Sequence, residues 1–347
     1  MNNNNTPAGA GEQTPREVNF ASTAWNEFGY ENLLEHLAEL TPYGISNYPE
    51  PDNITLRTML AKRNNLKPQN FVVVNGRTAA FYRIAQAWAG ARAALLVPYY
   101  PQYKAATDRY GWKHKLLSND LSTEEIDLSE CDFCWLSSPN NPDGKVRSRA
   151  ELLRLIDAHP RVKFVLDQSY STFTTVPGIT MADIKTHPNI IVVRSFTHAY
   201  GLPGLRIGYI VADVPVAQQI SRFLEPWSVN TLSVEAVKFI LIHPAQFTLP
   251  IRKWQRSAKE LIDKLRTIDG LTVFPGDVPF FLVRLERVKG AALVKHLREQ
   301  YGFRIHDASG FEGLDDRYVR ITARSEEQNN ALVQAIQESL SLPEFAK

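Results

Sequence analysis

The segments VKFVLD (162–167) and NIIVVRS (189–195) decide the fold of this chain. Each is a short apolar run rich in β-branched residues that ends in polar residues, as expected of a strand buried on both faces of a sheet. Helix-like stretches such as SRAELLRLIDAH (148–159) separate some of these runs. This alternation predicts an α/β fold with a mainly parallel sheet covered on both faces by helices. The earlier strand-like runs are FVVVN (71–75), AALLV (93–97) and DFCWLSS (132–138).

Length and composition exclude several classes of function. The 347 residues are 44% hydrophobic and 22% charged, which suits a large domain plus a smaller one. The formal net charge is only +2, so charge gives no reason to expect nucleic acid or a membrane surface as a partner. No apolar run approaches the roughly 20 residues of a membrane span. The N-terminus lacks the layout of a signal peptide, so we expect a cytoplasmic protein.

The two cysteines, Cys131 and Cys134, form a CxxC pair. A redox or metal role competes here with simple burial in a strand. Burial is the favoured interpretation because a structural zinc site needs four ligands and the chain has no second pair. We therefore predict no metal site, and the absence of a disulfide framework suits a reducing compartment.

The pattern divides the chain into four segments. Residues 1–15 are polar and rich in Gly and Pro, which predicts a disordered tail. Residues 48–230 carry the alternating pattern and form the large domain. Residues 231–347 begin with two long helix-like stretches and continue with strands and helices, which predicts a smaller α+β domain. Residues 16–47 are expected to pack with this smaller domain.

Polar, aromatic and Gly or Pro residues follow the predicted strands. Ligands of open parallel sheets bind at the carboxyl ends of the strands, so we expect these residues to share a site. Gly76, Arg77 and Thr78 would open a helix whose free backbone N–H groups bind an anion. Ser195 and Arg206 add a hydroxyl and a guanidinium, and both suit phosphate.

Two further residues at this edge suit an aromatic ring. Asp167 ends an apolar strand and needs a partner there, a role that a protonated ring nitrogen would fill. Tyr100 could cover the face of the same ring. Each feature alone has a plain structural explanation, such as a helix cap or a turn. Their shared location favours a ligand site.

Four ordered motifs resemble those of fold-type-I enzymes that use pyridoxal 5′-phosphate. SFTHAYGLPGLRIGY (195–209) resembles the signature Ser-x-x-Lys…Gly-x-Arg-x-Gly, and SSPNNPDG (137–144) resembles an Asn-Pro-x-Gly turn. VLDQSYSTF (165–173) resembles an Asp-x-x-Tyr strand end, and NYPEP (47–51) matches the approach to a phosphate site. The chain is thus similar to class I and II aminotransferases from about residue 17 to 340. Within them it resembles threonine-phosphate decarboxylases and histidinol-phosphate aminotransferases.

The resemblance implies an aspartate-aminotransferase-like fold whose large domain binds pyridoxal phosphate. It implies that Asp167 pairs with the pyridine nitrogen, that Tyr170 and Asn141 contact the phenolic oxygen, and that Tyr100 stacks on the ring. The phosphate would be held by Gly76, Arg77, Thr78, Ser195 and Arg206.

The resemblance also implies a substrate site and a partner. Arg320 would bind the substrate carboxylate, and Arg324 would meet a second anionic group. Tyr48 would reach the phosphate of the neighbouring subunit, which implies a homodimer with shared sites.

Residue 198 departs from the family, because His198 stands where the lysine that forms an imine with the cofactor is expected. Imidazole is not a primary amine, so the cofactor (pyridoxal phosphate or the pyridoxamine form) would be bound non-covalently. His198 could still serve as a general base, together with Asp167 and Tyr170 as catalytic residues. His306 is a second departure, since relatives usually have Arg there.

Three interpretations therefore stay open. The chain is an enzyme acting on a small amino acid, phosphorylated ones included, by transamination or decarboxylation. Alternatively it is a relative that binds cofactor without efficient catalysis. A third interpretation is an enzyme that uses pyridoxamine phosphate with His198 as base, as in sugar dehydratases that place histidine at this position.

Overall fold

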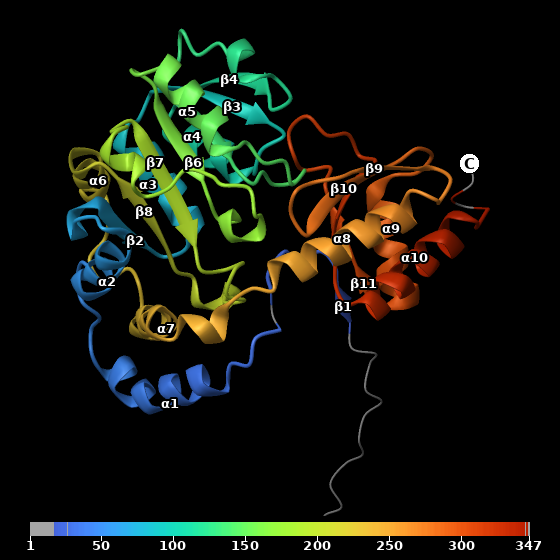
Figure 1. Ribbon diagram of the computed structural model, residues 1–347, viewed down its shortest axis with the longest axis horizontal. Helices are drawn as coiled ribbons and strands as arrows, with labels where there is room; N and C mark the ends of the chain where they lie inside the picture. Colours follow the sequence, from blue (N-terminus) through green and yellow to red (C-terminus); the bar gives the residue numbers. More distant parts are fainter. Residues whose placement is uncertain (1–16, 26, 344, 346–347) are drawn as a thin grey trace, which may run out of the picture.

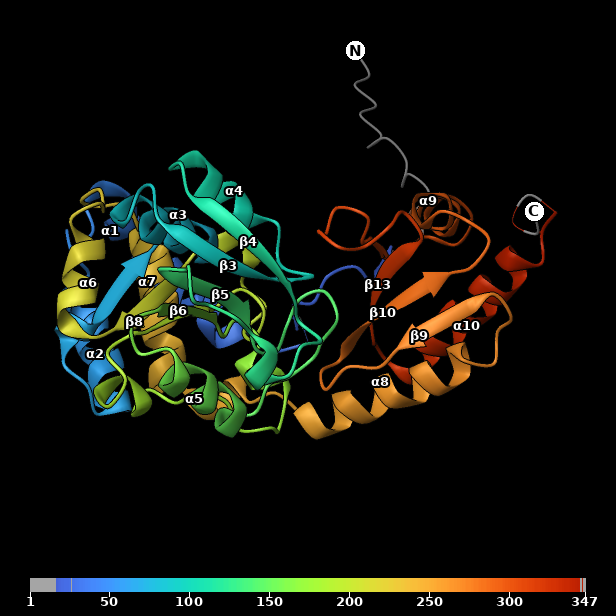
Figure 2. The same cartoon turned by 90° about the horizontal axis from the view of Figure 1, so that it is seen from above.

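The computed structural model describes residues 17–25, 27–343 and 345 of the chain. These residues form two lobes that lie side by side (Figures 1 and 2). The predicted tail, residues 1–15, lies outside the described residues. In the described part of the chain, no helix is long and apolar enough to cross a membrane.

The larger lobe is built on a seven-stranded sheet in the order β2-β8-β7-β6-β5-β3-β4. Strand β8 runs antiparallel to both of its neighbours, and the other neighbouring pairs are parallel. This is the mainly parallel sheet that the alternating pattern predicts, so the predicted α/β fold class is confirmed. The strands are β2 (Phe71–Val74), β3 (Arg92–Val97), β4 (Lys113–Ser118), β5 (Phe133–Ser137), β6 (Lys163–Asp167), β7 (Ile190–Ser195) and β8 (Gly208–Ala212).

Helices cover both faces of this sheet. Successive strand residues point to opposite faces, so Leu95 and Leu96 of β3 enter two different cores. Burying one such leucine stabilises the fold by roughly 1.5–3 kcal/mol. One core is closed by α2 (Ile54–Asn64), α5 (Arg149–Ala158) and α7 (Thr231–Ile242), the other by α3 (Arg77–Ala87), α4 (Gln102–Arg109) and α6 (Val214–Ser221).

The smaller lobe has its own antiparallel sheet in the order β12-β13-β10-β9 and its own core. Phe281 of β10, Leu261 of α8 and Leu332 of α10 are among its buried residues. The elements are α8 (Ile251–Leu265), β9 (Leu271–Phe274), β10 (Phe280–Leu285), α9 (Gly290–Tyr301), β11 (Phe303–Arg304), β12 (His306–Asp307), β13 (Tyr318–Thr322) and α10 (Glu326–Leu340).

The N-terminal segment is shared between the lobes. Strand β1 (Val18–Asn19) pairs with β11, and Phe20 lies in the core of the smaller lobe. Helix α1 (Glu31–Ser46) instead lies along α7 (Figure 1). Because α7 contributes Val234 and Val237 to the core of the large sheet, the packing places α1 and α7 with the larger lobe. The predicted boundaries at residues 48 and 231 group α1 and α7 with the smaller domain, whereas the packing groups both helices with the larger lobe.

Candidate functional site

Residues from both lobes meet at the carboxyl ends of β2, β3, β5, β6 and β7. The larger lobe supplies most of them, while Arg320 comes from β13 and Thr23 from the N-terminal segment. A ligand at this edge would be enclosed by the sheet on one side and by the smaller lobe on the other.

Asp167 is the acidic centre of the site. It is 2% exposed, and all of its contacts come from donors. Tyr103 Oη and Arg77 Nη1 donate to Oδ2 at 2.8 and 3.2 Å. The backbone N–H and the hydroxyl of Ser169 donate to Oδ1 at 2.9 and 2.6 Å. Both oxygens of this carboxylate therefore accept hydrogen bonds from neighbouring side chains or backbone.

Arg77 extends from the first turn of α3 across this carboxylate. Its guanidinium carbon lies 4.4 Å from the centre of the Tyr100 ring and 5.8 Å from that of Tyr170. The residue is only 7% exposed. Burial opposes the charge, but Asp167 and the surrounding tyrosines outweigh this and raise the pKa of Arg77. Arg77 is therefore a buried cation held by a carboxylate and an aromatic face.

His198 is held by two hydroxyl groups. Its Nδ1 lies 3.0 Å from Thr23 Oγ1, and its Nε2 lies 3.3 Å from Tyr170 Oη. The two hydroxyls are themselves 2.9 Å apart, so the three polar groups form a closed triangle. The imidazole also packs on the Tyr170 ring, with centroids 4.6 Å apart.

The surroundings keep His198 uncharged. Burial first, and then the charges of Arg77, Arg320 and Arg206, lower its pKa well below the ordinary value of 6.5. Burial and Arg320 likewise lower the pKa of His306 to about 4. At neutral pH both imidazoles are therefore neutral, and the positive charge of the site resides on the arginines.

Arg320 is buried, with 6% exposure, and its Nη1 donates to Asn141 Oδ1 at 2.6 Å. Its Nη2 donates to the carbonyl of Ala21 at 2.8 Å. Within the described residues, the buried Nε of Arg320 has no hydrogen-bond partner. An unpaired buried N–H of a cation is costly, and an anionic ligand would satisfy it.

Arg324 lies apart from this cluster. Its guanidinium donates to the carbonyls of Asn19, Ser22 and Ala24 and so holds the N-terminal segment. Burial lowers its pKa to about 10, which leaves it charged at neutral pH. Its contact with an anionic group stays a prediction.

The predicted phosphate residues surround the start of α3. Gly76 precedes the helix with a φ of 81°, and among the described residues no side chain caps this end. A Cβ at Gly76 would lie 2.5 Å from Nη2 of Arg206, so the guanidinium of Arg206 lies against the glycine backbone. Ser195 is buried at the end of β7, and its hydroxyl accepts from the N–H of Thr197 at 3.0 Å. Thr78 is the second residue of α3 and is partly buried.

Tyr48 is far from being buried. It is 84% exposed and packs only loosely against Trp227, at 5.3 Å between ring centres. Its contact with a neighbouring subunit stays a prediction.

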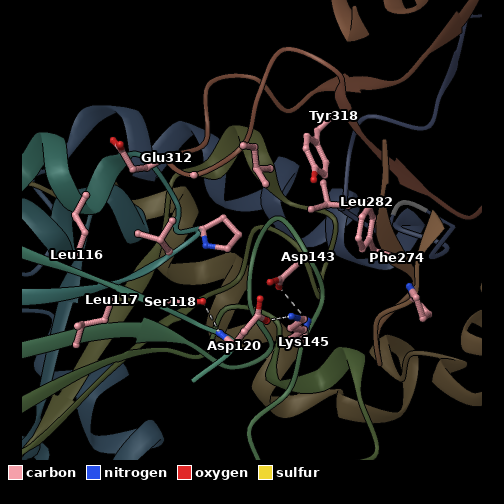
Figure 3. A pocket seen from close by; sticks show the side chains of 15 residues that line it. Leu116, Leu117, Ser118, Asp120, Asp143, Lys145, Phe274, Leu282, Glu312 and Tyr318 are labelled. Atoms are coloured by element: carbon pink, nitrogen blue, oxygen red, sulfur yellow. Dashed lines mark hydrogen bonds and ion pairs between the residues drawn. The ribbon is translucent and has the colours of Figure 1, made fainter. Parts of the chain in front are cut away.

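A cavity of about 480 Å³ lies between the lobes beside this cluster (Figure 3). It opens between the end of β4, the loop that carries Asp143 and Lys145, and the β9–β10 side of the smaller lobe. Lys145 pairs with Asp120 in its lining, and burial raises the pKa of Asp143. Leu282 lines the cavity and also packs near Tyr100. None of the predicted site residues lines this cavity.

Some residues of the cluster have no signal in the sequence. Thr23 is 175 positions from His198, and Tyr103 is 64 positions from Asp167. A helix pattern with a tyrosine at one turn predicts burial but not the carboxylate that the hydroxyl meets. Thr23 lies in a segment of the family resemblance, yet its spacing does not predict an imidazole partner.

Comparison with known proteins gives a consistent result. The family model for aminotransferase class I and II matches residues 17–336. The chain is 27% identical over 338 residues to the threonine-phosphate decarboxylase of Salmonella typhimurium, covering 90% of this chain and 92% of that protein. It is also 27% identical over 343 residues to the histidinol-phosphate aminotransferase of Bacillus subtilis subsp. natto, covering 91% and 94%.

Solved structures extend the likeness. The crystal structure of L-threonine-O-3-phosphate decarboxylase from Porphyromonas gingivalis matches with a TM-score of 0.92 and 48% identity over 94% of this chain and all of that one. The histidinol-phosphate aminotransferase from Sinorhizobium meliloti, solved in complex with pyridoxal-5′-phosphate, matches with a TM-score of 0.79 at 20% identity over 93% of this chain and 90% of that one. The second likeness concerns the fold alone.

Proposed function

Because the chain belongs to the aminotransferase class I and II family, we propose that it binds pyridoxal or pyridoxamine phosphate without a covalent bond and acts on a small phosphorylated amino acid. The observation that carries this proposal is an imidazole at residue 198, beside Tyr170, in a site that also holds Asp167, Asn141 and Arg206.

The residues fit the cofactor in chemistry. The uncapped first turn of α3, with Arg206 against Gly76, offers N–H groups and a cation for a phosphate. Asp167 is a buried carboxylate suited to a protonated ring nitrogen. The guanidinium of Arg77 lies in front of it, but it is carried by a long side chain that can leave by rotation. The fit is complete once Arg77 has moved.

The cofactor, when bound, supplies an electron sink for charge that develops on the substrate. Asp167 would hold the ring in its protonated, electron-withdrawing form. Arg320 would bind the substrate carboxylate through its unpaired Nε, and Asn141 holds the guanidinium of Arg320 in place. His198 would take up a proton at Nε2, beside the Tyr170 hydroxyl. Its lowered pKa makes it a weak base, so we expect slow turnover.

The names of the relatives support a phosphorylated substrate. The similar proteins are named for threonine phosphate and for histidinol phosphate, two small molecules that share a phosphate group. The arginines of the site outnumber Asp167, its buried acid, so the balance of charge favours an anionic substrate.

We also propose that the chain acts as a homodimer in the cytoplasm. The surface around α1 supports the dimer, because Tyr43, Ile45, Tyr48 and Trp227 are large apolar residues with 64%, 76%, 84% and 48% exposure. We call these four residues the α1 patch. Tyr48 and Trp227 pack on each other with ring centres 5.3 Å apart, and an exposed apolar surface is typical of a protein–protein contact.

A second candidate is a cofactor-binding protein without turnover. The hydrogen bonds that hold His198 between Thr23 and Tyr170 favour it, because a group tied to two hydroxyls has lost much of its freedom to reach a substrate.

The test is an absorbance titration of the purified protein with pyridoxal phosphate and, separately, pyridoxamine phosphate. Borohydride treatment and intact-mass measurement then follow. We expect saturable binding of both and no added mass. A covalent adduct would mean that another lysine has taken the family role, and no binding of either form would refute the proposal. Incubation with O-phosphothreonine separates slow turnover from the second candidate.

A further inference from the structure

The guanidinium of Arg77 has the two contacts that define the position of a cofactor ring. Its Nη1 lies 3.2 Å from Asp167 Oδ2, and its central carbon lies 4.4 Å from the centre of the Tyr100 ring. The family resemblance implies that Asp167 pairs with the ring nitrogen and that Tyr100 stacks on the ring face. The Arg77 guanidinium and a protonated cofactor ring therefore cannot occupy this position at the same time.

The chemistry of the two groups is alike. A guanidinium and a protonated pyridine are both flat, carry one positive charge, and stack on aromatic faces. Asp167 is therefore satisfied with Arg77 as it would be with the cofactor. Tyr103 and Ser169 also donate to this carboxylate.

The contact between Arg77 and Asp167 is buried and is fixed by the surrounding secondary structure. Arg77 and Asp167 are 7% and 2% exposed, and they are brought together by the first turn of α3 and the end of β6. Arg77 is the first residue of α3, and the backbone of β8 closes the space behind it, since a Cβ at Gly208 would lie 3.2 Å from Arg77 N. The backbone thus fixes where the side chain starts, and Asp167 fixes where it ends.

We propose that Arg77 is an internal competitor of the cofactor, whose guanidinium occupies the ring position and must be displaced before the ring can bind. This rests on the proposed function for the identity of the displaced ligand. Removing the guanidinium should therefore strengthen binding, which is the opposite of what a phosphate-binding arginine at this position would show.

The test compares full-length wild type with Arg77→Ala and Arg77→Gln, and uses Arg83→Ala as the control. Arg83 lies on the same helix but pairs with Glu225 away from the site. The probe is pyridoxamine, which carries the ring without the phosphate, so a contact between Arg77 and phosphate cannot enter the result. Binding is followed by tryptophan fluorescence. We expect both Arg77 variants to bind pyridoxamine at least about tenfold more tightly than wild type, and Arg83→Ala to match wild type. Equal or weaker binding by folded Arg77 variants would overturn the inference.

A second measurement separates this inference from the proposed function. Methylguanidinium is added to Arg77→Ala, and the melting temperature is recorded beside wild type and Arg83→Ala. A rise specific to Arg77→Ala supports a cation position between Asp167 and Tyr100, even if neither form of the phosphorylated cofactor binds any variant. In that case the proposed function is rejected, while the conclusion that the Arg77 guanidinium occupies a cation position between Asp167 and Tyr100 is kept. The inference about Arg77 is refuted if methylguanidinium does not raise the melting temperature of Arg77→Ala specifically and the Arg77 variants bind pyridoxamine no more tightly than wild type. If pyridoxamine phosphate still binds wild type, this result leaves the proposed function standing.

Discussion

At residue 198 the imidazole lies among three arginines and two hydroxyls. The arginines and burial lower its pKa, while Thr23 and Tyr170 fix its orientation. The histidine at this position is visible in the sequence, but the partners of its side chain are not. Thr23 comes from a distant segment, and only the packed structure shows that it closes the triangle. The same is true of Arg77, which the resemblance assigns to phosphate and the structure places on Asp167.

Replacing His198 with lysine should restore a covalent link to pyridoxal phosphate. Burial and the nearby arginines that disfavour an imidazolium would also lower the pKa of a lysine amine, which leaves it neutral and nucleophilic. We expect a borohydride-stable mass increase of one cofactor per chain for His198→Lys and none for wild type. His198→Gln is the control. An unmodified His198→Lys protein that nevertheless binds the cofactor would show that the amine does not reach it.

The two neutral histidines should make stability depend on pH. Their folded pKa values are lower than the unfolded value of about 6.5, so the unfolded chain binds more protons below that pH. Stability is therefore complete above about pH 6.5 and is lost as pH falls toward 4, by at most about 1.4 kcal/mol per pH unit for each histidine. Partial exposure makes the real slope smaller. Urea unfolding between pH 7.5 and 4.5 should show a shallower decline for His198→Asn and His306→Asn. Identical slopes in all three proteins would exclude this origin.

Elements differ in how well the sequence predicts them. The buried strands β5, β6 and β7 are continuous apolar runs, and the predicted runs coincide with them. Strand β4 escapes prediction because KHKLLS is polar at the edge of the sheet, where only one neighbour holds it. Helix α7 is predicted as a helix, yet which lobe it joins depends on long-range packing with α2, which periodicity does not contain. The carboxyl edge of the sheet, by contrast, follows from strand direction alone, and this is why most predicted site residues meet there.

The turn from β2 into α3 allows a direct test of the proposed phosphate site. Gly76→Ala would place a methyl group 2.5 Å from Arg206 Nη2 at a φ of 81°. Gly90→Ala is a matched control, because its φ is 82° and the described residues place nothing within 4 Å of the new methyl group. Both should lose on the order of 1 kcal/mol of unfolding free energy from backbone strain. Gly76→Ala alone should displace Arg206 and weaken binding of pyridoxamine phosphate about tenfold or more. Equal affinities in the two variants would remove Arg206 from the phosphate site.

At the scale of the whole molecule, three separate parts of the chain contribute residues to the site. The larger lobe carries Asp167 at the end of β6 and His198 after β7, β13 of the smaller lobe carries Arg320, and the N-terminal segment carries Thr23. Arg324 secures that segment through its carbonyl contacts, so the smaller lobe helps to orient a residue that touches the imidazole. The sequence pattern of strands and helices predicts each lobe. It does not predict that residues of both lobes and of the N-terminal segment meet at one site, because that arrangement depends on how the lobes pack against each other.

The α1 patch should decide the oligomeric state. Tyr43, Ile45, Tyr48 and Trp227 leave apolar surface in water, and burying it against a second copy would recover roughly 25 cal/mol per Å². We expect wild type to sediment as a dimer at micromolar concentration and Ile45→Asp/Tyr48→Asp to sediment as a monomer. Phe274→Asp, an exposed aromatic on β9 of the smaller lobe, should remain a dimer. If Tyr48 also reaches the neighbouring phosphate, the monomer will bind pyridoxamine phosphate more weakly while its affinity for unphosphorylated pyridoxamine stays the same. A monomeric wild type would reject the dimer, and equal loss for both ligands would mean that the patch supports the site through folding and not through Tyr48.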